Sequence, residues 1–178
     1  MKKKIFFILF ISITISSEIM DKTFKIITDK FPENISVKHD IYHLNKKVAI
    51  NIQNKVRQEF FRSELNIWKI VSQDSTKYYA ILDNVKGKSL PITFLAIYDN
   101  KGNVFDTEII KYRESYGGEI KNKSWLKQFF RYNDSSNYNV GSTISGISGA
   151  TISVKSVTKG MQKLSILIHQ LIKDLDER

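Results

Sequence analysis

A run of small and hydroxyl-bearing residues near the C-terminal end is the part of this sequence best suited to bind a ligand. Residues 141–153 read GSTISGISGATIS, and an amphipathic segment follows directly. Glycine and alanine let a ligand approach the backbone closely, and a helix start offers free N–H groups and a partial positive charge. The run therefore has the composition of a phosphate-binding loop. From the residues alone, a plain Ser/Gly-rich connection with Ser153 as the helix N-cap is favoured, because no Walker-type lysine is present.

Several motifs around this run resemble, in order and spacing, those of the FMN-binding domain family. Ser148, Gly149, Ala150 and Thr151 form an SGAT tetrapeptide like the one that is flavinylated in that family. The segments EIIKYRESY at 108–116 and WLKQF at 125–129 precede it, and a helical segment follows it, as in family members. The family includes flavin-carrying components of the sodium-pumping NADH:quinone reductase and of the Rnf electron-transport complex. The resemblance covers residues 68–171.

This resemblance implies a covalently bound cofactor, FMN. In the family, the phosphate of FMN esterifies the last Thr of the motif, and a separate magnesium-dependent flavin transferase performs the reaction with FAD. Carried over, Thr151 is the acceptor, the residues of the tetrapeptide before it shape the loop, and Ser153 lies beside the phosphate. The chain departs from the family at Ser145, where an acidic residue that helps the transferase recognise its target is usual. This departure concerns the modification and leaves the fold assignment untouched.

Five further positions are assigned to the cofactor site on the same basis. Glu114, Tyr116 and Gly117 lie in a stretch that resembles the family's glycine-containing turn, and Trp125 and Phe129 follow on the next predicted helix. The two aromatic residues are placed to flank the isoalloxazine ring. Core packing explains Trp125 and Phe129 equally well, because such side chains pack against apolar neighbours with or without a ring cofactor. A plain turn likewise explains the stretch around Gly117.

The elements that must position these residues follow from the spacing of apolar residues. Runs rich in β-branched and aromatic residues predict strands at 68–71, 78–82, 92–98 and 104–112. The DNKGN segment at 99–103 predicts a hairpin turn with Gly102 at positive φ. Helices are predicted over 44–63, 122–131 and 152–175. The sequence thus predicts an α+β fold, an antiparallel sheet with packed helices and a C-terminal amphipathic helix.

The start of the chain has the pattern of an export signal. Three lysines at 2–4 precede an apolar run at 5–15, which is too short to span a bilayer comfortably. We expect residues 1–17 to be a signal peptide that directs export to the periplasm or cell envelope. Residues 18–66 are then an accessory segment with a helix, and residues 67–178 the FMN-binding domain. An uncleaved anchor is the competing interpretation, so membrane association stays open.

Composition restricts the chemistry that the chain can perform by itself. The sequence has no Cys, which excludes disulfides, thiol nucleophiles and iron–sulfur clusters, so redox chemistry needs a bound cofactor. The net charge of +10 favours anionic partners, but the basic residues are scattered, and no nucleic-acid partner is expected. His39 and His43 are four residues apart without a third ligand in a metal-binding pattern, so no metal site is expected.

These observations predict an exported flavoprotein that carries FMN on Thr151 and transfers electrons to redox partner proteins of the cell envelope. No general base, nucleophile or substrate pocket is recognisable, so a carrier is preferred to an enzyme. Two alternatives stay open. One is a flavin-dependent extracytoplasmic reductase, and the other is a non-redox binding module that keeps the FMN-binding fold without flavinylation.

Overall fold

The chain folds around one five-stranded antiparallel sheet. A computed structural model describes residues 17–31 and 35–177. The strands lie in the order of the sequence, each paired with the next: β1 (Ser36–His43), β2 (Glu64–Val71), β3 (Lys77–Lys86), β4 (Pro91–Asp99) and β5 (Val104–Lys111). The predicted α+β class, with an antiparallel sheet and a C-terminal helix, is confirmed.

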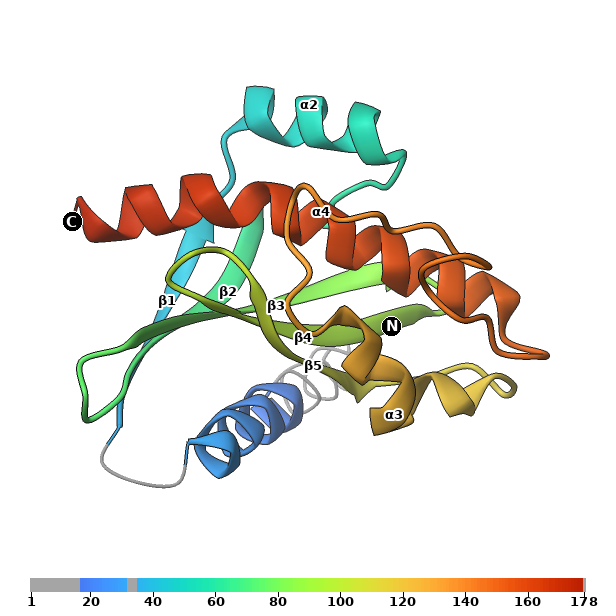
Figure 1. The fold of residues 1–178 in the computed structure, drawn as a ribbon, viewed down its shortest axis with the longest axis horizontal. Coiled ribbons are helices and arrows are strands. Elements are labelled where there is room, and N and C mark those ends of the chain that lie inside the picture. The colour runs from blue at the N-terminus through green and yellow to red at the C-terminus, as the bar shows by residue number, and fades with distance from the viewer. Residues whose placement is uncertain (1–16, 32–34, 178) are drawn as a thin grey trace, which may run out of the picture.

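Helices cover both faces of this sheet (Figure 1). The long helix α4 (Thr151–Asp176) crosses one face, and α2 (Lys46–Val56) packs on α4. A helix that includes residues 17–30 lies against the opposite face, where Ile27 belongs to the same buried cluster as Trp68 and Leu95. Because alternate residues of a strand point to opposite faces and both faces are covered, the interior strand β4 is buried except at its two end residues.

The amphipathic stripe predicted for the last helix is confirmed. Its apolar residues are buried against the sheet: Val154, Val157, Met161, Leu164, Leu167, Ile168 and Leu171. Gly160 lies on the same face, where α4 comes close to β3 and β4. A Cβ atom added there would lie 2.6 Å from Cγ1 of Val85 and 2.9 Å from Cζ of Phe94. A residue with a Cβ atom at position 160 would therefore clash with the sheet, and glycine lets α4 pack closely against it.

The helix predicted over 44–63 is shorter in the structure. It begins after Asn45, whose side chain accepts hydrogen bonds from the N–H groups of Lys47 and Val48. It ends at Arg57, which adopts a left-handed conformation with φ of 55°. The phenylalanines at 60 and 61 therefore lie beyond the helix, although their spacing fits its apolar stripe.

The segment 18–66, expected to be an accessory element, supplies a strand to the sheet. Strand β1 pairs with β2 from Ser36 opposite Val71 to His43 opposite Glu64. No strand was predicted there, because β1 is an edge strand whose residues are mostly exposed, which weakens the alternation of apolar and polar residues. His39 and His43 lie on this strand and not on a helix.

The turns and short helices near the β5 end of the sheet follow the predictions closely. The hairpin between β4 and β5 has Gly102 at φ of 81°, and the backbone oxygen of Asp99 accepts a hydrogen bond from the N–H of Gly102. The helix predicted over 122–131 is present as α3 (Lys123–Leu126), continued by the 3-10 turn η2 (Lys127–Phe129). Another 3-10 turn, η1 (Gly118–Lys121), precedes it. Residues 130–150 then lead to α4.

Candidate functional site

The start of α4 borders a hollow of about 540 Å³, which we call the Thr151 hollow. Three segments meet there: the turn between β3 and β4, the loop that follows β5, and the first turn of α4. Its lining residues are Lys88, Ser89, Tyr112, Glu114, Ser115, Tyr116, Gly149, Ala150, Thr151, Ile152 and Ser153. The hollow is within the size range of cofactor sites.

Thr151 is the first residue of α4, and its side chain is exposed. The N-cap is Ala150, which has no side chain able to cap the helix. Consequently, the backbone N–H groups of residues 151–153 donate to no acceptor among the described residues. Three unpaired donors at the positive end of a 26-residue helix favour an anion beside Thr151.

The prediction that Ser153 is the N-cap is wrong. Ser153 is the third residue of α4, is 5% exposed, and its hydroxyl lies 3.0 Å from the hydroxyl of Tyr112. The Tyr112 hydroxyl donates in turn to the backbone oxygen of Tyr116. The helix start, the end of β5 and the loop after β5 are thereby joined at one point, and the Ser153 side chain is held inside the site instead of closing the helix end.

Glu114 holds the wall of the hollow formed by the β3–β4 turn. Its Oε1 atom accepts hydrogen bonds from the N–H of Ser89 at 2.7 Å and the N–H of Leu90 at 2.9 Å, a pair of contacts that we call the Glu114 latch. These bonds, that from Leu90 foremost, lower the pKa of Glu114 below its ordinary value. A Cβ on Gly87 would lie 2.5 Å from the same carboxylate oxygen and 2.5 Å from the Leu90 oxygen. The Glu114 latch therefore needs both the carboxylate and the glycine.

Gly117 supports the loop of the tetrapeptide from behind. It adopts φ of 80°, which favours glycine, and a Cβ there would lie 2.9 Å from the Tyr112 hydroxyl and 3.0 Å from Cβ of Ala150. The small residues at 117 and 150 therefore let the loop after β5 pack directly against the start of α4.

The side chains of Tyr116 and Ile152 are exposed at the hollow, 85% and 48% respectively. Surface aromatic and aliphatic groups of this kind can pack against a flat apolar ring. Together with the unpaired N–H groups they offer what a flavin mononucleotide requires, a site for a phosphate and an apolar surface for the ring. The residues present therefore fit FMN.

Most of the predicted site residues are brought together at the hollow. Glu114, Tyr116, Gly149, Ala150, Thr151 and Ser153 all line it, and Gly117 packs directly behind it. Ser148 is exposed on the approach to α4 but is not among the lining residues.

Trp125 and Phe129 are not part of the hollow. They are 6% and 0% exposed and pack edge to face with ring centroids 5.3 Å apart in the main core. The indole N–H of Trp125 donates to the backbone oxygen of Ser145 at 2.8 Å. Trp125 and Phe129 therefore occupy core positions, which favours core packing over contact with the flavin ring. The bond from Trp125 also holds the loop of residues 130–150 against this core.

Lys88, Ser89 and Tyr112 line the hollow without having been singled out. Tyr112 stands at the end of a predicted strand, where a side chain that serves the site cannot be distinguished from one that packs on the sheet. Ser89, in the turn between β3 and β4, donates a hydrogen bond to Glu114, which lies 25 residues later in the sequence. Only the folded chain shows that the two segments meet.

Comparison with known protein families agrees with this geometry. The model of a family described as FMN-binding domain matches residues 87–165, from the β3–β4 turn to the middle of α4. No curated protein matches the chain. The matched range contains every residue that lines the Thr151 hollow. Residues 87–165, which hold the Thr151 hollow, therefore match the FMN-binding domain family.

Proposed function

We propose that this protein is an exported flavoprotein that carries FMN on Thr151 through a phosphoester bond and transfers electrons between partner proteins of the cell envelope. One observation carries the proposal. An exposed threonine hydroxyl begins a long helix with unpaired N–H groups, beside a hollow, within an FMN-binding domain.

The proposed attachment uses FAD as the donor and a separate flavin transferase as the catalyst. The Thr151 oxygen attacks the phosphorus on the FMN side of the FAD pyrophosphate and forms a P–O bond. The pyrophosphate P–O bond breaks, AMP leaves, and the hydroxyl proton passes to a base of the transferase or to water. Because the side chain of Thr151 is exposed and makes no hydrogen bond with a described residue, it is accessible to such an enzyme.

The residues around Thr151 would hold the attached group without an arginine clamp. A phosphodiester carries one negative charge, which the N–H groups of residues 151–153 can balance at the helix start. Tyr112 and Glu114 keep the walls of the hollow in place through their bonds to Ser153 and to the β3–β4 turn. When bound, the flavin supplies the one- or two-electron chemistry that the chain lacks.

Ser145 is compatible with attachment by a transferase that does not need an acidic residue there. Its N–H donates to Oε1 of Gln128 at 2.7 Å, and its oxygen accepts from Trp125, so both backbone groups are anchored. Its side chain is exposed. A change of this side chain therefore alters the surface that a transferase meets while leaving the loop in place.

Export is supported by the pattern of the first 17 residues, of which residues 1–16 lie outside the described part of the chain. Within residues 17–31 and 35–177, no helix combines the length and the apolar character needed to cross a membrane. A covalent link suits an exported carrier, because a micromolar noncovalent site, worth about 8 kcal/mol, empties when free FMN is dilute.

The deciding experiment is mass spectrometry of the full chain produced together with a flavin transferase and recovered after export. We expect the Thr151 peptide to gain the mass of one FMN group and the protein to be yellow. Thr151→Ala should abolish the mass gain, whereas Ser142→Ala, which removes an exposed hydroxyl outside the SGAT tetrapeptide, should keep it.

A second variant separates the alternatives. If the natural chain stays unmodified while Ser145→Asp is modified, the acceptor site is intact and only recognition has been lost. If both remain unmodified and colourless, the carrier function is refuted and the non-redox binding module is favoured. Multiple turnover of a small electron acceptor by the flavin-loaded protein would instead identify a reductase.

A further inference from the structure

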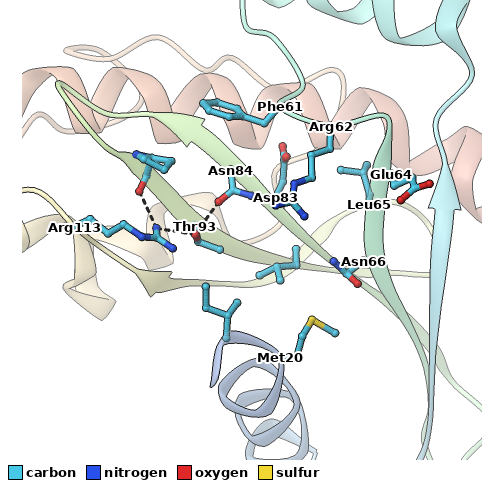
Figure 2. A pocket seen from close by; sticks show the side chains of 13 residues that line it. Met20, Phe61, Arg62, Glu64, Leu65, Asn66, Asp83, Asn84, Thr93 and Arg113 are labelled. Atoms are coloured by element: carbon cyan, nitrogen blue, oxygen red, sulfur yellow. Dashed lines mark hydrogen bonds between the residues drawn. The ribbon is translucent and has the colours of Figure 1, made fainter. Parts of the chain in front are cut away.

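A second cavity, of about 310 Å³, is lined by residues of β3, the start of β4, the segment 61–66 and the helix that includes residues 17–30. We call it the Arg113 pocket (Figure 2). Its lining residues are Ile19, Met20, Phe61, Arg62, Glu64, Leu65, Asn66, Leu82, Asp83, Asn84, Pro91, Thr93 and Arg113. It shares no lining residue with the Thr151 hollow, and no function described above uses it.

The polar groups of the pocket form a chain of hydrogen bonds with a fixed direction (Figure 2). Nη1 of Arg113 donates to the oxygen of Pro91 at 2.9 Å and to Oγ1 of Thr93 at 3.0 Å. A guanidinium only donates, so the single hydroxyl proton of Thr93 goes to Oδ1 of Asn84, 2.7 Å away. The Asn84 amide therefore presents its NH₂ group, and not its oxygen, to further partners.

The amide oxygens of the pocket each lie within hydrogen-bond distance of a partner. Oδ1 of Asn66 lies 3.0 Å from Nε2 of His39, and the Asn84 oxygen is taken by Thr93. The buried carboxylate of Asp83 forms an ion pair with Lys163 at 2.8 Å. The Glu64 carboxylate is exposed, and its Oε1 atom lies 3.5 Å from Nδ1 of His43.

Several N–H donors of the pocket, in contrast, have no acceptor among the described residues. Arg62 makes no hydrogen bond or ion pair with any residue of the described part of the chain. Of the Arg113 guanidinium, only Nη1 is used within the same residues. The NH₂ groups of Asn66 and Asn84 have no acceptor there either. Two guanidinium groups and two amides thus line the cavity with N–H donors that have no acceptor among the described residues.

From these unpaired donors we infer that the Arg113 pocket binds a small organic anion, a carboxylate with an apolar body. The carboxylate would accept hydrogen bonds from Arg62 and Arg113, which suit its planar geometry. Ile19, Met20 and Phe61 supply an apolar wall for the remainder of the molecule. The inference does not depend on flavin attachment, because none of these groups contacts Thr151.

The test is an NMR titration of the full exported chain with benzoate, and with benzamide as a neutral analogue of similar shape. We expect benzoate at millimolar concentration to shift the signals of the Asn66 and Asn84 side-chain amides and of the Arg113 guanidinium. Arg62→Gln and Arg113→Gln should each weaken binding about tenfold, the effect of one lost charge-assisted contact. Arg131→Gln, which removes the same charge elsewhere, should leave binding unchanged, as should Thr151→Ala.

Every other outcome overturns the inference. Absence of benzoate shifts would show that the donors do not bind an anion. Equal shifts with benzamide would show that charge plays no part. Binding that is equally strong in Arg62→Gln and in Arg131→Gln would reflect the overall positive charge of the protein. Because Thr151→Ala is expected to bind normally, failure of the flavin proposal and failure of this one are distinguishable.

Discussion

The hydroxyl groups of Tyr112 and Ser153 lie 3.0 Å apart and join the residue after β5 to the first turn of α4. Tyr112 also bonds the backbone of Tyr116, so one phenol organises two sides of the Thr151 hollow. No side chain caps the N-terminus of α4, and the bonds of Tyr112 hold the start of this helix in place instead.

Tyr112→Phe should loosen the loop after β5 without disturbing the core, because the ring is kept and two hydrogen bonds are lost. We expect the free energy of unfolding to fall by about 1 kcal/mol. Denaturant unfolding measures this loss, and FMN attachment by a transferase should be slower. Ser153→Ala, which removes one of the two bonds, should have the smaller effect. Equal stability of Tyr112→Phe and the natural protein would contradict this role.

The two hydrogen bonds of the Glu114 latch should weaken at acid pH. Since the folded state lowers the pKa of Glu114 below its ordinary value of 4.5, its stabilising effect is complete above that value and is lost as pH falls through the lowered pKa. Hydrogen-exchange protection of the Ser89 and Leu90 amides should therefore fall over that range. Glu114→Gln should lower the protection already at neutral pH and remove its pH dependence. Glu119→Gln, a change of a nearby exposed glutamate, serves as the control.

The buried pair of Lys163 and Asp83 should be costly to break. Both side chains are buried, and Lys163 also donates to the Glu59 oxygen at 2.8 Å and lies 4.2 Å from the centre of the Phe60 ring. Lys163→Met leaves an unpaired buried carboxylate and should reduce the free energy of unfolding by roughly 3–5 kcal/mol. Combining it with Asp83→Leu should recover part of the loss, because no charge is then buried.

The loss of stability caused by Lys163→Met should be smaller at acid pH than at neutral pH. Burial raises the pKa of Asp83, and the positive charge of Lys163 opposes this rise. Without Lys163 the rise is larger, so the folded state prefers the protonated carboxyl. A raised pKa gives stability that is present at low pH and is lost as pH rises. Denaturation midpoints at several pH values check this, and a loss that is independent of pH would contradict it.

Gly160→Ala should destabilise the protein although alanine favours helices. The gain in helix propensity is about 1 kcal/mol, whereas the added methyl group would lie within 3.0 Å of both Val85 and Phe94. Overpacking of a core costs about 1–3 kcal/mol, so we expect a net loss of about 1 kcal/mol. The difference in stability between Lys155→Gly and Lys155→Ala, at an exposed position of α4, provides the control for propensity alone. A more stable Gly160→Ala protein would show that the helix can shift away from the sheet.

Local patterns were sufficient for the elements that bury a regular stripe or contain a conformationally restricted turn. The apolar period of α4 and the Gly102 turn were predicted and are present, because each depends on residues a few positions apart. The resemblance of the SGAT run to the motif of FMN-binding domains indicated Thr151, which begins α4. Strand β1 was missed because it lies at the edge of the sheet, where exposed residues carry little periodic signal.

The sequence by itself determined the fold class and the long C-terminal helix, since both are encoded by neighbouring residues, and its resemblance to a known family indicated the segment around Thr151. Only the tertiary structure decided how the site is built. Ser153 is hydrogen-bonded to Tyr112 and is not the helix cap, and Trp125 and Phe129 lie in the core. Glu114 is hydrogen-bonded to the turn between β3 and β4. These contacts join segments far apart in the chain, and the choice among partners for a hydroxyl, ring or carboxylate depends on which segments the packed sheet and helices bring together.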